Sequence, residues 1–290
     1  MTQPSLAPRV DETPAALQRT IGVGRVAFKP APSDRPETRA TRLETLYQEG
    51  AAKVRLPKVY SDMAEAVLIN TSGGLTGGDV LDWSVEAGVN TRSVLTTQAC
   101  EKIYRANEGT ANVTSFLSLD KGAELHWLPQ ETILFDRSSL SRQLHVHMAQ
   151  DARFLAVEAV ILGRDAMGEQ VTEAHFSDRW RIHRGGKLVH ADDLLLSGKV
   201  SEIAAGSSTL ASQRAFASVV YVGPEDQEVL ETWCAKLRPK APDMSFGVSA
   251  FNGKITARLT AIDGFALRQK LIPFLQGLRP DQPLPKLWSL

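Results

Sequence analysis

Three things are scarce in this sequence: cysteine, long apolar runs and an excess of charge of either sign. Its 290 residues include 2 cysteines, Cys100 and Cys234, which are too few and too far apart for a disulfide framework. Lysine plus arginine and aspartate plus glutamate number 33 each, so the basic excess of a typical nucleic-acid-binding protein is missing. No apolar run approaches the length of a membrane span, and the N-terminus has no hydrophobic signal core. We therefore expect a cytoplasmic protein without nucleic-acid or membrane partners.

The sequence also lacks the short motifs C-x-x-C, H-E-x-x-H and G-x-S-x-G, which mark common redox, metal and hydrolase sites. Its glycine-rich stretch, NTSGGLTGGD at 70–79, is a poor nucleotide-binding loop. Gly73 and Gly78 have the separation of a Walker A loop, but Asp79 stands where that loop needs lysine. A carboxylate there would repel a phosphate. Since the next residues alternate between apolar and polar, the stretch predicts a tight connection between strands.

Alternation of apolar and polar residues dominates residues 40–200 and predicts a mainly β body. The Gly185–Gly186 and Asn252–Gly253 pairs each separate two alternating runs, which is typical of tight β-hairpins. The Asn-Gly pair favours a type I′ turn. The run LSRQLHVHM places four apolar side chains on one face, namely Leu140, Leu144, Val146 and Met148.

Helical periodicity is confined to the C-terminal part of the chain, at 224–239 and 263–279. The side chains expected to face inward are Val229, Leu230, Trp233 and Leu237 in the first helix, and Leu267, Leu271, Phe274, Leu275 and Leu278 in the second. We predict a flexible N-terminus at 1–20 and a single domain at 21–290. Its β body spans about 21–222 and its helix-containing part about 223–290. The fold class is mainly β with a smaller α portion: a stacked or sandwich-like multi-strand body with two C-terminal helices.

Glu158 is the most unusual acid, because it interrupts the apolar run FLAVEAVILG and shares its face with Phe154 and Val160. A buried carboxylate costs several kcal/mol unless it is paired or hydrogen-bonded. One interpretation is an internal salt bridge, for instance to Arg164 or Lys102. The other is a hydrated interior through which a cation could pass. The residues alone leave both open.

Other candidate residues have an ordinary interpretation beside the functional one. His145 and His147 form H-x-H on a strand and could be a pair of metal ligands, but the polar face of an amphipathic strand is favoured because the sequence shows no third ligand nearby. Cys100 would need a base to act as a nucleophile, and burial as a small apolar residue is favoured. Asp79, Glu101, Glu131 and the Asp192–Asp193 pair are acids in unusual local settings, and none forms a defensible acid–base pair.

Four motifs, in this order, carry a resemblance: TSGGLTGGD, TTQACEKIYR, LPQETILFD and ILGRDAMGE, followed by the ending LPKLW. Together they resemble the urease accessory protein D family (UreD, called UreH in some organisms). The similarity covers nearly the whole chain after the N-terminus and is strongest at 67–136 and 158–196. Cys100 departs from the pattern, since a small residue such as alanine or glycine is expected there.

The resemblance implies a non-enzymatic maturation factor that binds the urease apoprotein on one side and the accessory protein UreF on another. UreF in turn recruits the GTPase UreG, which carries nickel. The family is proposed to pass Ni²⁺ to urease through a polar internal tunnel, so the resemblance implies transient Ni²⁺ and no tightly bound cofactor. The missing Walker A lysine agrees with this, because GTP hydrolysis would belong to the partner.

A conduit must bind its ion weakly and repeatedly, and spaced carboxylates suit that task better than fixed imidazole or thiolate clusters. We expect Asp79, Glu101, Glu158 and Asp192 to line such a conduit. A structural part is expected for Gly73, Gly74, Gly77, Gly78 and Glu131, where the glycines would allow sharp turns and close packing.

Two other functions remain open. The first is a hydrolytic enzyme on a β scaffold, using Glu101, Glu131 or Cys100, which would need two catalytic groups within hydrogen-bond reach in a pocket. The second is a binding module without metal transfer. The C-terminal helices and the tail with Trp288 are expected to contact a protein partner.

Overall fold

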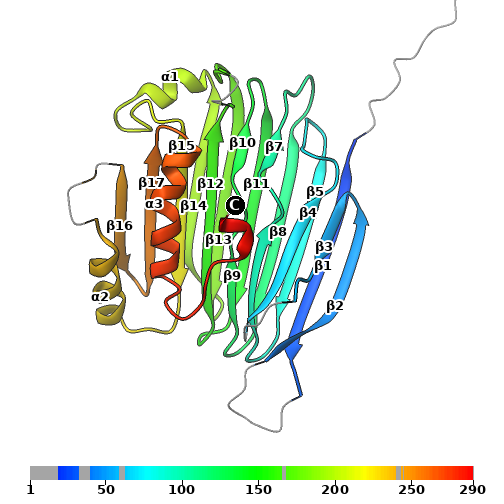
Figure 1. Cartoon of the computed structure of the whole chain (residues 1–290), viewed down its shortest axis with the longest axis vertical. Helices are drawn as coiled ribbons and strands as arrows, with labels where there is room; N and C mark the ends of the chain where they lie inside the picture. Colours follow the sequence, from blue (N-terminus) through cyan, green and yellow to red (C-terminus); the bar gives the residue numbers. More distant parts are fainter. Residues whose placement is uncertain are drawn as a thin grey trace, which may run out of the picture.

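The computed structural model describes residues 19–32, 40–58, 63–164, 168–239, 243 and 245–289. Two β-sheets and a helical layer make up this part of the chain (Figure 1). The expected flexible N-terminus lies outside the described residues except for its last two.

Sheet A is seven-stranded and has the order β14-β13-β11-β8-β5-β1-β2. Its strands are β1 (Ile21–Pro30), β2 (Thr41–Gly50), β5 (Val80–Ala87), β8 (Ala111–Leu119), β11 (Ser139–Met148), β13 (Ala174–Arg184) and β14 (Lys187–Gly198).

Sheet B is ten-stranded, with the order β16-β17-β15-β12-β9-β6-β4-β3 and with β10 and β7 paired beside β12. Its strands are β3 (Ala52–Arg55), β4 (Ala64–Asn70), β6 (Arg92–Thr97), β7 (Glu101–Ile103), β9 (Glu124–Trp127), β10 (Thr132–Leu134), β12 (Arg153–Leu162), β15 (Ala215–Val222), β16 (Phe246–Phe251) and β17 (Lys254–Ala261).

From β4 to β13 the chain winds back and forth between the sheets. The neighbours β5, β8, β11 and β13 are parallel in sheet A, and β4, β6, β9 and β12 are parallel in sheet B. Parallel neighbours need a crossover connection, and here the strands of the opposite sheet provide it. The expected stacked β body is therefore confirmed, and its stacking is that of a solenoid.

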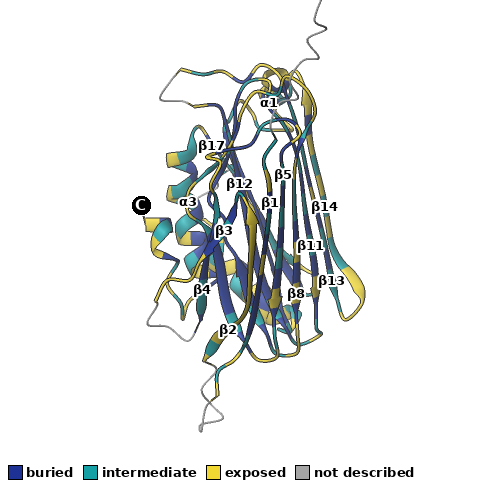
Figure 2. Ribbon diagram, turned by 90° about the vertical axis from the view of Figure 1, so that its right-hand side faces the viewer, coloured by how far each residue is buried: buried dark blue, intermediate teal, exposed yellow. Residues whose placement is uncertain are grey.

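The two apolar cores explain the two kinds of strand in the sequence. One core fills the space between the sheets, and the second lies between sheet B and the C-terminal helices (Figure 2). β12 and β15 are covered on both faces, so they read as nearly continuous apolar runs. Strands of sheet A such as β11 alternate strictly between buried and accessible residues because their outer face meets solvent.

Both predicted C-terminal helices are present, as α2 (Gln227–Leu237) and α3 (Gly264–Gly277), followed by a 3₁₀ helix, η2 (Lys286–Ser289). The expected inward face of α3 is confirmed, since its five apolar side chains are buried. The inward face expected for α2 is correct at Leu230, which is buried, and wrong at Val229, which is 40% exposed. The second buried residue of this helix is Cys234. A short helix, α1 (Val200–Ala205), was not expected within the β body.

Both hairpins are confirmed, β13–β14 and β16–β17. Asn252 and Gly253 have φ values of 50° and 71°, as a type I′ turn requires. Among the described residues there is no helix with the length and apolar character needed to cross a membrane.

Candidate functional site

The four acids expected to line a conduit come from separate parts of the fold. Asp79 precedes β5, Glu101 begins β7, Glu158 lies in the middle of β12 and Asp192 is on the edge strand β14. No group of three or more histidine, cysteine, aspartate or glutamate side chains that could hold a metal ion occurs in the described residues.

Glu158 belongs to a buried charge cluster between the sheets, together with Arg142 of β11 and Asp178 of β13. The Arg142 Nη1 atom lies 2.6 Å from Glu158 Oε2. The same guanidinium binds Asp178 in a bidentate manner, with Nε 3.1 Å from Oδ1 and Nη2 2.8 Å from Oδ2. All three residues are at most 7% exposed. Two carboxylates and one guanidinium leave the cluster one negative charge in excess when all are ionised.

Tryptophan and threonine side chains complete the hydrogen bonding of this cluster. Trp127 Nε1 donates to Glu158 Oε1 at 3.0 Å, and Trp180 Nε1 donates to Asp178 Oδ2 at 3.3 Å. Arg142 Nη1 also donates to Thr132 Oγ1 at 3.0 Å. Buried ionic groups are tolerated when the remaining lone pairs and protons are satisfied in this way.

Burial affects the pKa values of Glu158 and Arg142 in this cluster differently. Burial raises the pKa of Glu158 to about 7, although Arg142 opposes the rise. Burial also acts to lower the pKa of Arg142, but Asp178 and Glu158 outweigh it and raise that pKa above its usual value. The Glu158 carboxyl can therefore gain or lose a proton near neutral pH while the guanidinium stays charged.

The examples Arg164 and Lys102 were wrong as partners of Glu158, because the ion pair is made with Arg142. Arg164 instead pairs with Glu169 at 2.9 Å. The sequence did contain a signal: Arg142 lies on the inward face of the β11 run, between Leu140 and Leu144. Asp178 likewise interrupts the apolar face of β13.

Asp79 closes the glycine-rich loop. The residue is 4% exposed, and its two carboxylate oxygens accept hydrogen bonds from the backbone N–H groups of Thr20 at 2.8 Å and Thr76 at 2.7 Å. A Cβ atom on Gly77 would lie 2.1 Å from the Glu108 carbonyl oxygen, and Gly78 has a φ of 88°. The loop therefore packs closely at Gly77 and has a left-handed backbone conformation at Gly78.

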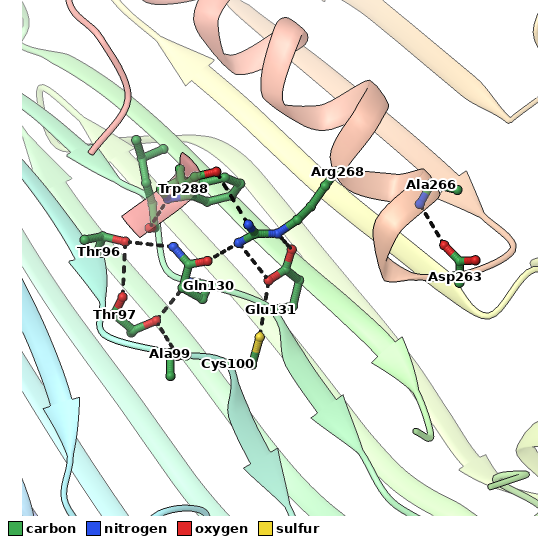
Figure 3. A network of polar contacts seen from close by, with 11 residues as sticks. Thr96, Thr97, Ala99, Cys100, Gln130, Glu131, Asp263, Ala266, Arg268 and Trp288 are labelled. Carbon is green, nitrogen blue, oxygen red and sulfur yellow. Dashed lines mark hydrogen bonds and ion pairs between the residues drawn. The ribbon is translucent and has the colours of Figure 1, made fainter. Parts of the chain in front are cut away.

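Glu131 and Arg268 fasten α3 to sheet B (Figure 3). Arg268 Nε lies 2.7 Å from Glu131 Oε1, and the same guanidinium also bonds to Gln130. Trp288 of η2 donates through Nε1 to the Leu128 carbonyl at 3.1 Å. These contacts hold the C-terminal helix and the tail on the outer face of sheet B.

Cys100 and Glu101 lie beside the ion pair between Glu131 and Arg268. Burial, and then the charge of Glu131, raise the pKa of the Cys100 thiol to about 11, and its Sγ donates to Glu131 Oε2 at 3.4 Å. Burial raises the pKa of Glu101 to about 7, against a hydrogen bond from Asn70 Nδ2 at 3.0 Å. A protonated thiol beside a carboxylate that is already paired with arginine is poorly suited to nucleophilic catalysis.

Asp192 lines a cavity of about 410 Å³ where β14 of sheet A meets β15 and β17 of sheet B. Its carboxylate is bound by Arg258. Burial lowers the pKa of His190 to about 4 in the same cavity, so its imidazole is neutral at pH 7. The polar lining consists of His190, Asp192, Ser218, Lys254, Thr256 and Arg258.

The inner wall of this cavity adjoins the buried charge cluster. Ser218 and Trp180 both line the cavity. Ser218 is the register partner of Glu158 on the neighbouring strand, and Trp180 donates to Asp178. Sequence reasoning identified Glu158 and Asp192 but missed His190, Ser218 and Lys254, because strands far apart in the sequence bring them together.

Comparisons with known proteins agree over almost the whole chain. The family model described as UreD urease accessory protein matches residues 23–289. A urease accessory protein UreD from Agrobacterium fabrum is 50% identical over 279 residues, which cover 96% of this chain and 94% of the relative. The corresponding protein of Rhizobium leguminosarum bv. viciae is 54% identical over 250 residues, or 86% and 90% of the two chains. That of Chelativorans sp. is 46% identical over 280 residues, or 97% and 98%.

Proposed function

Because the chain belongs to the UreD family of urease accessory proteins, we propose that it is a non-catalytic scaffold that binds the urease apoprotein and UreF and helps to pass Ni²⁺ to the urease active site. UreG would join through UreF. The observation that carries the nickel part of the proposal is the contact between the Asp192 cavity and the buried Glu158 cluster.

The excess negative charge of the buried cluster suits a transient cation, because its two carboxylates face one guanidinium. The cavity in front of it adds hydroxyl oxygens, while its one acid, Asp192, is already bound by Arg258 and lies in the same lining as Lys254. Glu158 can release its proton near neutral pH, which would compensate part of the charge of an arriving divalent ion. Oxygen ligands bind nickel less tightly than several imidazoles or thiolates would, so the ion could move on.

A groove beside the C-terminal tail supports the scaffold part of the proposal. The groove measures about 720 Å³ and lies between β3, β4 and the segment before η2. Apolar side chains such as Met63 and Leu284 form its walls, and four basic side chains surround one acid, Glu65. We assign it to an acidic, partly apolar segment of a maturation partner, since opposite charges favour such a contact. The basic side chains are Arg55, Lys58, Arg279 and Lys286.

Co-expression in nickel-limited cells tests both parts. Glu158→Gln keeps the shape of the side chain but removes its charge, and we expect urease to carry less nickel while the chain still co-purifies with urease and UreF. The matched control is Glu86→Gln on the exposed outer face of β5, which should leave nickel loading unchanged.

Lys286→Glu tests the groove, and we expect roughly tenfold weaker association at low salt because one attractive charge becomes repulsive. Lys236→Glu, on the exposed side of α2, is the control. Full nickel loading with Glu158→Gln, together with intact association, would favour the binding module without metal transfer. If the wild-type chain co-purified with neither urease nor UreF, the proposal that it is a scaffold would be contradicted.

A further inference from the structure

Two histidines from different strands stack on the outer face of sheet A. The imidazole rings of His147 on β11 and His183 on β13 have centroids 4.9 Å apart and planes inclined by 6°. They are 36 residues apart in sequence, and the parallel register of the two strands makes them direct neighbours. This face points away from the buried charge cluster, because Val146 and Ile182, adjacent to the two histidines, point into the core.

Neither ring is held by a hydrogen bond in the part of the chain that the structure describes. The buried Nδ1 atom of His183 has no hydrogen-bond partner there. His147 is exposed and His183 is partly accessible, so an ion could approach the pair from solvent. The neighbour of His147 on the other side is Ser118 of β8, which adds a hydroxyl oxygen to the same row.

We propose that His147 and His183 form a two-imidazole binding site for a borderline divalent transition ion such as Ni²⁺. Neutral imidazole nitrogen is a preferred ligand of nickel, copper and zinc. Ligand bonds of 2.0–2.1 Å, as found for zinc, require the two coordinating nitrogens to be about 3 Å apart. In the stacked arrangement the ring planes are nearly parallel, so the exposed His147 has to rotate out of the stack before one nitrogen of each ring can bind the same ion.

The cross-strand pair is a better site than the H-x-H pair in the sequence. His145 stacks on Phe116 with centroids 4.9 Å apart, and its Nε2 lies 3.2 Å from Gln143 Oε1. The Nε2 atom of His145 is therefore already engaged by Gln143, whereas no hydrogen bond engages the rings of His147 and His183 in the described residues. Sequence reasoning missed the pair because the second imidazole comes from the next strand of the sheet rather than from the same run.

The site goes beyond the proposed function, since it lies on the opposite face of sheet A from the Glu158 cluster and does not depend on an internal passage. With two protein ligands it leaves most coordination positions to water or to a ligand from another protein. Such a site would collect an ion on the surface and release it readily.

Ni²⁺ titration of the purified full chain by calorimetry tests the proposal. His147→Gln and His183→Gln should each weaken the same Ni²⁺ site at least about tenfold, and the double variant should lose that one site and no other. His145→Gln is the matched control on the same strand. His175→Gln is the control on β13, where the imidazole Nδ1 is 3.1 Å from Ser197 Oγ. Neither control should change the affinity.

A measurement on the wild-type chain avoids any effect of substitution on folding. Ni²⁺ should slow the modification of His147 and His183 by diethyl pyrocarbonate while leaving His175 as reactive as before. Unchanged Ni²⁺ affinity in the double variant, or protection of His145 in place of His183, would overturn the proposal.

Discussion

Arg142 of β11 and Glu158 of β12 lie in different sheets, yet their side chains meet with Nη1 2.6 Å from Oε2. The pair joins the two layers at their centre, and Asp178 binds the other side of the same guanidinium. A single arginine therefore binds one carboxylate from each sheet.

Arg142→Met should destabilise the chain by about 3–5 kcal/mol, because it leaves two buried carboxylates without a counter-charge. Urea denaturation measures the loss. Arg179→Met is the control, since this arginine pairs with Asp193 on the outer face with a side chain 56% exposed. Its effect should be much smaller. Similar losses for the two variants would contradict the central part assigned to Arg142.

Glu101 should make the chain less stable as the pH rises from about 4.5 to about 7, the window between its usual pKa and its pKa in the folded chain. The folded state binds the proton more tightly than the unfolded state does, so folding favours the protonated form. This stability is complete below pH 4.5 and is lost as the pH passes 7, with a slope of at most about 1.4 kcal/mol per pH unit.

The difference in unfolding free energy between the wild-type chain and Glu101→Gln isolates this contribution from that of Glu158. It should change with pH in that window and be constant above pH 8. A difference that is flat from pH 4 to pH 8 would show that the carboxyl titrates normally.

Cys100 should react slowly with iodoacetamide, since burial raises its thiol pKa from 9.0 to about 11. This rise in the pKa reduces the thiolate fraction at pH 8 about 100-fold, and the thiolate is the reactive form. Peptide mass spectrometry can follow this cysteine separately from Cys234. The rate should still rise about tenfold per pH unit up to pH 10, whereas a plateau near pH 9 would contradict the raised pKa.

Gly77→Ala should destabilise the chain by about 2–3 kcal/mol, because the new Cβ would lie 2.1 Å from the Glu108 carbonyl oxygen. Gly247→Ala is the matched control, since a Cβ at that position would meet no atom within 4 Å. Thermal unfolding of the two variants gives the comparison. An equal shift in Tm would mean that the loop at 70–79 can open without loss.

Local chemistry made several elements predictable. The turn residues Gly185 and Asn252 identified both hairpins, and the apolar stripe of α3 identified its buried face. Glu158 could be recognised as a buried acid because its run is otherwise apolar. Its partner could not, since the register between sheets depends on contacts across the core that no periodicity of one strand reports.

The candidate site was less predictable than the fold for the same reason. Asp192 was identified from its setting, but the cavity around it combines side chains of β14, β15, β16 and β17. The stacked histidines on β11 and β13 likewise require the parallel register of two strands. In each case the sequence supplied the residue type, and the pairing of distant strands supplied the neighbour.

The winding of the chain between the two sheets also bears on how the protein folds during synthesis. Each parallel neighbour from β4 to β13 is separated along the chain by a strand of the opposite layer, so few of these contacts are local. The ladder partner of Val80, for example, is Asn112, so a strand stays unpaired on one edge until roughly 30 further residues have been made, and apolar strands left uncovered during synthesis are prone to aggregate. Until its last windings and α3 have been made, the nascent chain would depend on chaperones, and truncated products should aggregate.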